Sequence, residues 1–184
     1  FENRIAEVIA RELGAELTYT WWPHQRGLVR RTLNAGTCDL LIGVPAGYDR
    51  VLSTRPYYRP SYVIVQPRDR GPKIATLDDP RLQRLKIGFH INSPPTEALA
   101  ERGVVGDNVI GYPLYYDSRY HPEDYPGRII EDLLAGTIDV AIVWGPIAGY
   151  FTRKGSATAS LLELAPLDGG RDGLPFAFRI SMGV

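Results

Sequence analysis

The chain has 184 residues, 44% of them hydrophobic, and its 21 Lys and Arg residues are balanced by 21 Asp and Glu residues. This length supports one large domain or two small lobes with a buried core. Zero net charge gives no electrostatic footprint for nucleic acid or an anionic membrane, and no apolar run approaches the roughly 20 residues that span a bilayer. The chain opens directly on a predicted helix, so we expect a mature or partial sequence in which the lack of a signal peptide carries little information.

The first elements predicted are a helix, a strand and a second helix. Apolar residues at helical spacing from Ile5 to Leu13 predict a helix that Gly14 ends. Alternation of apolar and polar residues over 17–21 then predicts a strand. A second helix is expected over 27–35.

The end of this helix belongs to a unit that the chain repeats 100 positions later. Residues 33–39 and 133–139 share the pattern L-x-A-G-T-x-D, and a short apolar run follows each copy. The glycine stands where a helix ends and the backbone needs a positive φ, and the apolar run is typical of a strand buried on both faces. We expect Asp39 and Asp139 to accept backbone N–H bonds. Two copies predict two similar α/β lobes with a ligand-binding cleft between them.

Between the two copies the sequence predicts a crossing from lobe one to lobe two. The loop 44–50 follows the carboxyl end of a buried strand, where α/β sheets commonly bind ligands. Two prolines and then an extended run mark 54–65 as the first crossing, and 66–72 is polar enough to be a linker.

Lobe two is expected to alternate helices and strands around a tyrosine-rich loop at 112–125. An Asp-Pro helix start at 79–80 precedes a strand over 85–91, and a loop at 92–96 caps a helix over 97–102. Backbone N–H groups at that helix start can hold an anion or a polar ligand group. A short strand at 109–110 and, after the second copy of the repeat, a helix with Ile147 and Phe151 complete the lobe.

The tail is expected to return to lobe one, because its alternating residues over 176–182 predict a strand that completes the first sheet. The predicted fold is therefore α/β and two-lobed. Lobe one comprises 1–65 and 160–184, lobe two comprises 66–159, and two crossings join them.

This series of elements resembles the type II periplasmic solute-binding fold over nearly the whole chain. The resemblance is carried by A-x-E-L-G at 10–14, by both L-x-x-G-x-x-D copies and by T-x-P-Y-Y at 54–58. Longer matches point to a narrower family, and these are YTWWPHQRG at 19–27, AGTCD at 35–39, GVPxxYDRV at 43–51 and TRPYYR at 54–59. They resemble the MxaJ and XoxJ accessory proteins, which are encoded beside periplasmic quinoprotein methanol dehydrogenases.

The resemblance implies a non-catalytic periplasmic protein, without a cofactor of its own, that assists activation, maturation or assembly of a PQQ-containing methanol dehydrogenase in methanol oxidation. The implied partner is the XoxF-like or MxaF-like large subunit of that enzyme, with its cytochrome c as a further possibility. We favour the XoxJ type, which accompanies the lanthanide-dependent enzyme, over the MxaJ type of the calcium-dependent one. No nucleic acid and no membrane span are expected.

Measured against that fold, the sequence lacks the usual first strand and the closing C-terminal helices. Cys38 is the single cysteine. From composition alone it is a small buried hydrophobe or the partner of an unseen cysteine. Relatives often carry a cysteine in the first strand, and the resemblance therefore raises the disulfide interpretation.

Amino-acid-binding members of the fold hold the substrate carboxylate with an Arg in lobe one and its amino group with an Asp in lobe two. Arg50 is a possible match for the first group, although it lies closer to the 54–57 crossing than the family pattern has it. Trp144-Gly145-Pro146 stands where the Asp is expected, and an unpaired ammonium in a closed site is costly. We therefore predict that ordinary α-amino acids are not bound.

An aromatic cleft suited to a peptide or a protein loop is the remaining expectation. The predicted cleft or partner-binding residues are Trp21, Trp22, Tyr48, Arg50, Tyr57, Tyr58, Ser93, Thr96 and Trp144. The predicted partner-surface residues in the tyrosine-rich loop are Tyr115, Tyr116 and Tyr120. Packing in a core or hinge is the alternative for Tyr57 and Tyr58, and for Trp22 and Trp144 both interpretations stay open.

An enzyme is the weaker hypothesis. His24, His90 and His121 have no metal-ligand spacing, no catalytic serine elbow or P-loop occurs, and His90 is expected to be structural. Three hypotheses are carried forward: an accessory protein, an ABC-transporter receptor for a small ligand other than an amino acid, and an enzyme of the cyclohexadienyl dehydratase kind.

Overall fold

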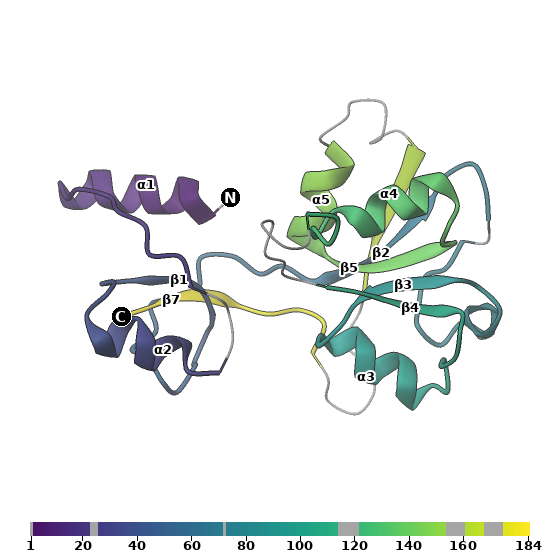
Figure 1. The fold of residues 1–184 in the computed structure, drawn as a ribbon, viewed down its shortest axis with the longest axis horizontal. Helices are drawn as coiled ribbons and strands as arrows, with labels where there is room; N and C mark the ends of the chain where they lie inside the picture. Colours follow the sequence, from purple (N-terminus) through teal and green to yellow (C-terminus); the bar gives the residue numbers. More distant parts are fainter. Residues whose placement is uncertain (1, 23–25, 72, 114–121, 154–160, 168–174) are drawn as a thin grey trace. The chain divides into compact units, whose positions relative to one another are not determined.

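The computed structural model describes residues 2–22, 26–71, 73–113, 122–153, 161–167 and 175–184. The chain forms two compact units (Figure 1). Unit 1 comprises Phe1–Arg59 and Phe178–Val184, and unit 2 comprises Pro60–Ala177. The chain therefore crosses from unit 1 to unit 2 after Arg59 and returns after Ala177.

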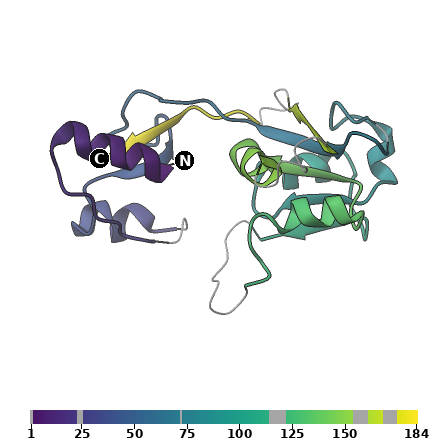
Figure 2. The same ribbon diagram turned by 90° about the horizontal axis from the view of Figure 1, so that it is seen from above.

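Unit 1 is built on a two-stranded antiparallel sheet. Its elements are α1 (Glu2–Leu13), α2 (Leu28–Arg31), the 3-10 helix η1 (Leu33–Ala35), β1 (Leu41–Pro45) and β7 (Ile180–Gly183). β1 pairs with β7, and the pairing is irregular between Ile42 and Val44, where Gly43 has a φ of 87°. Helix α1 packs on β1 (Figures 1 and 2). Of the tail expected in lobe one, the part from Phe178 to Val184 lies in unit 1, where β7 pairs with β1.

Two local predictions in unit 1 are wrong. Residues 15–22 form no strand; their alternation matches a strand, but no segment among the described residues pairs with them. The helix expected over 27–35 breaks at Thr32 into α2 and η1. The Thr32 hydroxyl donates to the Leu28 carbonyl at 2.7 Å, and such a bond from a threonine to a helix carbonyl competes with regular helix.

Unit 2 is a five-stranded mixed sheet in the order β4-β3-β5-β2-β6. Its elements are β2 (Tyr62–Pro67), η2 (Pro80–Gln83), β3 (Ile87–His90), α3 (Pro94–Glu101), β4 (Val109–Tyr112), α4 (Arg128–Ala135), β5 (Val140–Trp144), α5 (Gly145–Arg153) and β6 (Leu162–Pro166). β3 runs parallel to β4 and β5, and β2 runs antiparallel to β5 and β6. Helices α4 and α5 cover one face of the sheet, and α3 lies on the other (Figure 1).

The division of the chain differs from the predicted boundaries at 65 and 160. β2 is no crossing, because all six of its residues are buried between β5 and β6. Gln66 likewise belongs to the sheet, not to a linker: its side chain exchanges two hydrogen bonds with the Ile74 backbone. β6 pairs with β2 and so belongs to unit 2. Hydrogen bonding across the sheet therefore moves both predicted boundaries.

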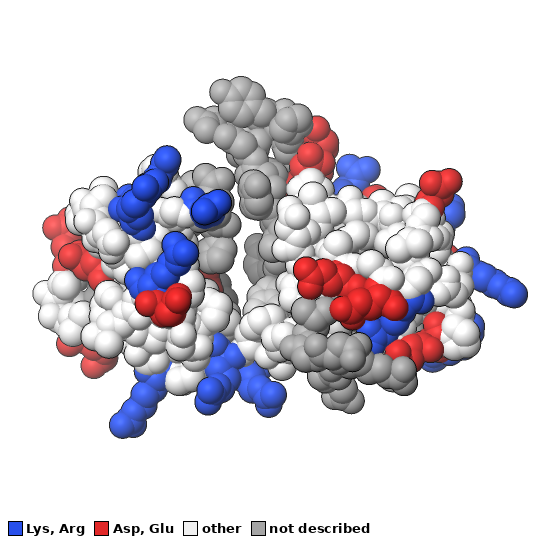
Figure 3. All heavy atoms as spheres, turned by 90° about the horizontal axis from the view of Figure 1, so that it is seen from below, with Lys and Arg blue, Asp and Glu red and all other residues white. Residues whose placement is uncertain are grey.

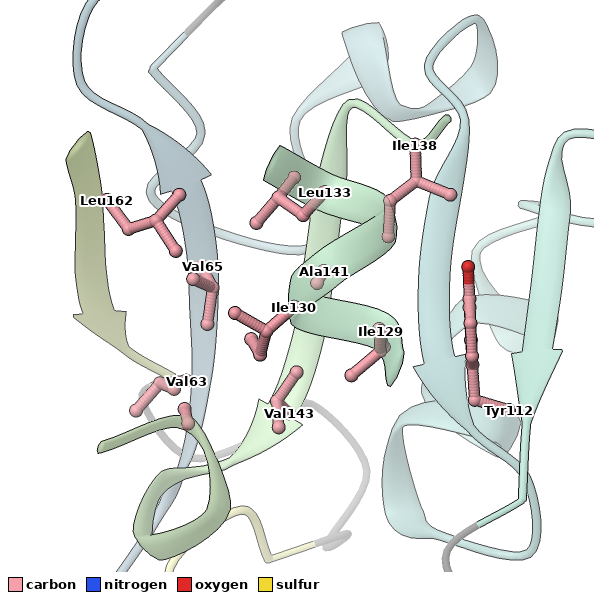
Figure 4. Close-up of a cluster of buried hydrophobic side chains, with 11 residues drawn as sticks. Val63, Val65, Tyr112, Ile129, Ile130, Leu133, Ile138, Ala141, Val143 and Leu162 are labelled. Atoms are coloured by element: carbon pink, nitrogen blue, oxygen red, sulfur yellow. The ribbon is translucent and has the colours of Figure 1, made fainter. Parts of the chain in front are cut away.

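The core of unit 2 lies between the sheet and α4 (Figure 4). Ile129, Ile130 and Leu133 of α4 point towards the sheet, and all three are buried. Gly88 lets β3 approach this helix, since a Cβ there would lie 2.5 Å from Ile138 and 3.1 Å from Ile129. None of the helices in the described ranges is both long enough and apolar enough for a membrane crossing.

Candidate functional site

The repeated unit folds in the same way in both copies. Gly36 and Gly136 have φ values of 64° and 77°, and each donates its N–H to the carbonyl three residues before it. The N–H of Thr37 bonds to the Thr32 carbonyl at 3.1 Å, and that of Thr137 bonds to the Asp132 carbonyl at 2.9 Å. The predicted glycine turns are confirmed, and they turn the chain from a helical turn towards β1 and β5.

The two aspartates that follow the turns differ in their bonds. A carboxylate oxygen of Asp139 accepts the Lys86 N–H at 2.8 Å, and the Asp139 N–H donates to the Lys86 carbonyl at 2.8 Å. These bonds tie the start of β5 to the start of β3, as predicted for Asp139. The expected bonds of Asp39 are not formed, since its carboxylate has no partner among the described residues.

In unit 2 the predicted polar residues Ser93 and Thr96 lie at the start of α3. The Ser93 N–H bonds to the Thr96 hydroxyl at 3.4 Å, and the Ser93 hydroxyl donates to the His90 carbonyl. Pro94 occupies the first helical position, where its missing N–H costs nothing. Both hydroxyls therefore fix the turn from β3 into α3.

Trp144 ends β5 and packs against Tyr62 of β2. The two residues face each other in the antiparallel pair, and their ring centroids are 5.0 Å apart. The next residue is held closely, because a Cβ on Gly145 would lie 2.6 Å from the Ser61 carbonyl oxygen. Trp144 is half-buried, so its indole acts partly as packing. Burial raises the pKa of Tyr62, a contact residue that the sequence did not single out.

His90 is fully buried at the end of β3. Its Nε2 lies 3.3 Å from the Pro126 carbonyl oxygen, and its Nδ1 has no hydrogen-bond partner among the described residues. Burial lowers the pKa of His90, and the Pro126 carbonyl opposes this shift only in part. The ring is therefore neutral at pH 7, with Nε2 as the donor, which fits the expected structural role.

In unit 1, Tyr48 and Arg50 lie in the turn after β1. The Tyr48 N–H bonds to the Pro45 carbonyl at 3.1 Å, and the Val51 N–H bonds to the Tyr48 carbonyl at 3.3 Å. Tyr48 is half-buried, and Arg50 is exposed. The Arg50 guanidinium has no acidic partner among the described residues, so it is available to an anionic group.

Tyr57 and Tyr58 are held against β7 and the start of α1. The Tyr57 N–H bonds to the Ile180 carbonyl at 2.9 Å, and the Ile180 N–H bonds to the Tyr58 carbonyl at 3.0 Å. The two rings are 5.0 Å apart. Burial raises the pKa of Tyr57 to about 12, and the Glu2 charge adds to the shift; burial and Glu2 also raise the pKa of Tyr58. These rings pack within unit 1 immediately before the chain leaves it.

Trp21 and Trp22 are both exposed, with 76% and 40% of their surface accessible. Trp21 stacks on Tyr19 with ring centroids 5.6 Å apart and an interplanar angle of 21°. The Arg31 guanidinium lies over the Trp22 ring, 5.8 Å from its centroid. Tyr19 and Arg31 were not singled out from the sequence, although the alternation at 19–21 already places Tyr19 and Trp21 on one side of an extended chain.

Several predicted residues fall outside the described part of the chain. These are Tyr115, Tyr116 and Tyr120 of the tyrosine-rich loop, together with His24 and His121. Among the residues that the structure describes, no group of three or more His, Cys, Asp or Glu side chains could hold a metal ion. Cys38 is half-buried and unpaired, and its pairing with a cysteine of another segment stays a prediction.

The comparisons with known proteins give the chain its family. No protein-family model matches it. It is 28% identical to the protein MoxJ of Methylorubrum extorquens AM1, covering all of this chain and 64% of that relative. It is 31% identical to the protein MoxJ of Paracoccus denitrificans over 198 residues, which cover all of this chain and 70% of that relative. The chain belongs to the MoxJ family. It spans about two thirds of the length of these relatives.

Solved structures of similar proteins share the fold. The periplasmic binding protein XoxJ from Methylobacterium extorquens AM1 matches with a TM-score of 0.74 and 34% identity, over all of this chain and 74% of that one. MxaJ from a Methlophaga species matches with a TM-score of 0.77 and 24% identity over 78% of its length. A substrate-binding protein of an amino acid ABC transporter shares the fold at 21% identity and a TM-score of 0.60. The chain therefore has the two-lobed periplasmic binding protein fold, as predicted.

Proposed function

We propose that this MoxJ-family chain is a non-catalytic periplasmic accessory protein that assists activation, maturation or assembly of a PQQ-containing methanol dehydrogenase. The observation that carries the proposal is the match of the whole chain to MoxJ of Paracoccus denitrificans at 31% identity. Its match to XoxJ at 34% identity supports the lanthanide-dependent enzyme as the partner. The large subunit of that enzyme is the expected contact, with its cytochrome c as a second one.

The side chains of the two units support protein binding over amino-acid binding. In unit 2 the hydroxyls of Ser93 and Thr96 form hydrogen bonds at the start of α3. The indole of Trp144, packed on Tyr62, occupies the position at which an amino-acid-binding protein of this fold has a carboxylate for the ammonium group. In unit 1 the predicted site residues Trp21, Trp22 and Arg50 are exposed, and aromatic and arginine side chains carry much of the binding energy of protein interfaces.

Biolayer interferometry against the purified dehydrogenase tests the proposal directly. The immobilised full-length protein is expected to bind the dehydrogenase and to leave an unrelated quinoprotein of similar charge unbound. A strain without this protein is expected to make dehydrogenase with reduced activity, which a plasmid copy restores. Full enzyme activity in the deletion strain, together with no binding, would overturn the proposal.

A transport receptor is the second candidate, favoured only by the fold shared with the amino acid transporter protein. We expect no amino acid to bind. Isothermal titration calorimetry with the twenty free amino acids checks this, and a dissociation constant below about 1 μM, or about −8 kcal/mol, for any of them would favour the receptor.

A further inference from the structure

We propose that Tyr19, Trp21, Trp22 and Arg31 form a docking patch on unit 1 for a protein partner whose contacting surface is acidic. The identity of that partner rests on the proposed function, while the patch itself rests on the contacts and charges of unit 1. The four residues are called the aromatic–arginine patch below.

Three exposed aromatic rings within four successive positions of one segment are the first observation. Trp21 is 76% exposed, and Tyr19, on which it stacks, is 45% exposed. Trp22 follows directly in the chain and is exposed as well. Single exposed apolar residues are ordinary on protein surfaces, but a stacked pair of large exposed rings such as Tyr19 and Trp21 is typical of an interaction site, since each ring buries about 150–250 Å² when covered.

The rings are already ordered, which lowers the cost of binding. The Tyr19–Trp21 stack and the Arg31 guanidinium over Trp22 restrict these side chains before any partner arrives. The Thr20 hydroxyl donates to the Thr37 carbonyl at 2.7 Å and fixes the backbone between the rings. Side chains held in place lose less conformational freedom on association, so the patch suits a stable contact.

Charge identifies the kind of partner. Unit 1 contains nine arginines and six acidic residues, a net charge of +3, while unit 2 has twelve basic and fifteen acidic residues, a net charge of −3. Arg31 and its neighbour Arg30 are exposed and have no acidic partner among the described residues. On the face drawn in Figure 3, unit 1 carries several basic side chains that stand apart from any acidic one. An acidic surface around an apolar depression would complement this patch.

Other occupants fit less well. A symmetric dimer would place two copies of the same basic patch against each other, which like charges oppose. A net charge of +3 over a whole unit is small for nucleic acid, whose binding needs several phosphate contacts. The experiments below distinguish a second copy of the chain and a nucleic acid from an acidic protein partner.

The test compares two patch variants with two matched controls in the full-length protein. Trp21→Ala removes the most exposed ring, and Arg31→Glu reverses the unpaired charge. Tyr150→Ala and Arg84→Glu are the controls, because Tyr150 is 62% exposed and Arg84 is exposed without an acidic partner, both in unit 2. All four positions lie on the surface, and circular dichroism checks that each variant folds.

Each patch variant is expected to weaken binding of the purified dehydrogenase by at least about tenfold, as for interface hot spots, and the controls by less than about twofold. Arg31→Glu is also expected to flatten the dependence of the association rate on salt. Equal binding by all five proteins would overturn the patch and leave the accessory function standing. Lack of binding by the wild type would instead remove the accessory function.

A second measurement tests whether the patch is open in the free protein. In a Trp144→Phe variant of this 184-residue chain the indole fluorescence comes from Trp21 and Trp22 alone, and we expect acrylamide to quench it strongly in the absence of a partner. Protection before the partner is added would overturn the patch, because it would show that another segment or a second copy covers it. Sedimentation analysis detects a second copy. If an added nucleic acid displaced the dehydrogenase from the wild-type protein, the patch would be a nucleic-acid surface, and this result would also overturn the proposal.

Discussion

β1 and β5 follow the same helix-turn motif, yet their surroundings differ. Four of the five β5 residues are buried, with β3 and β2 as paired neighbours. In β1 only Val44 is buried, and β7 is its paired neighbour among the described strands. The start of β5 is tied to Lys86 through Asp139, whereas the Asp39 carboxylate has no partner within the described part of the chain. The two copies of the repeated motif thus form the same turn. The strands that pair with β1 and β5 decide how much each copy contributes to the stability of its unit.

The largest difference is expected between the leucines that open the two copies. Leu133 is fully buried in the unit 2 core, and Leu33 is half-buried. Leu133→Ala should lower the free energy of unfolding of unit 2 by about 3 kcal/mol through the cavity that it leaves, and Leu33→Ala should cost unit 1 about 1 kcal/mol. Hydrogen exchange of the β5 and β1 amides measures the two units separately. Equal losses of unfolding free energy in the two units would contradict the expected difference between β5 and β1.

The aspartates should show the next largest difference. Asp139→Ala leaves the Lys86 N–H without its carboxylate, which costs about 1–2 kcal/mol. Asp39→Ala removes no bond formed by the described residues, and we expect less than about 0.5 kcal/mol. Guanidinium unfolding of both variants checks this. If Asp39→Ala lowered the free energy of unfolding as much as Asp139→Ala, Asp39 would be bonded to a segment outside the described residues.

The glycines should behave alike. Gly36 and Gly136 both have positive φ, and no atom lies within 3.4 Å of the Cβ position at either. Alanine in the left-handed region costs roughly 1 kcal/mol, so Gly36→Ala and Gly136→Ala should destabilise their units by similar amounts. Thermal unfolding of the pair, with Gly149→Ala as a control inside helix α5, measures the cost; a difference above about 1 kcal/mol would argue against equal turns.

The last expected difference is a pH dependence that His90 gives to unit 2. The pKa of His90 lies below its ordinary value of 6.5 in the folded protein, so the unfolded chain binds the proton first as the pH falls. The stabilising effect of the neutral ring is fully present above about pH 6.5 and is lost as the pH falls towards the folded pKa, by at most about 1.4 kcal/mol per pH unit. Unfolding titrations at pH 7.5 and 5.5 should show this loss, and His90→Gln should abolish it. An unchanged slope in that variant would assign it to other groups.

Local chemistry made much of the fold predictable. The L-x-A-G-T-x-D copies predicted both turns, the apolar run of β5 predicted a strand buried on both faces, and the Asp79-Pro80 start of η2 was read correctly, with the Asp79 carboxylate accepting the Arg81 N–H at 2.9 Å. The series of motifs also led to the family. These features depend on residues within a few positions of one another, so the sequence itself carries them.

The candidate site was less predictable, because the surroundings of its residues depend on the folded structure. Ser93 and Thr96 were expected to face a ligand, but their hydroxyls bond within the α3 start. The prediction of Trp144 as a rim residue could not include Tyr62, which reaches it only through the β2–β5 pairing. Arg31 contacts Trp22 from a separate element, α2, with its guanidinium 5.8 Å from the ring centroid, and the spacing of the two residues in the sequence does not predict this contact.

The sequence by itself determined the repeated turns, because glycine conformation fixes them. It also determined the two-lobed α/β class and the family, because these are carried by the short-range spacing of residues in the motifs. Tertiary structure alone decided that β2 and β6 belong to unit 2 and that β1 is half-exposed while β5 is buried. It also decided that Asp139 is tied to a neighbouring strand, a bond that Asp39 does not make with any residue the structure describes. Pairing between distant strands sets these features, and a strand's pattern of apolar residues does not name its partner.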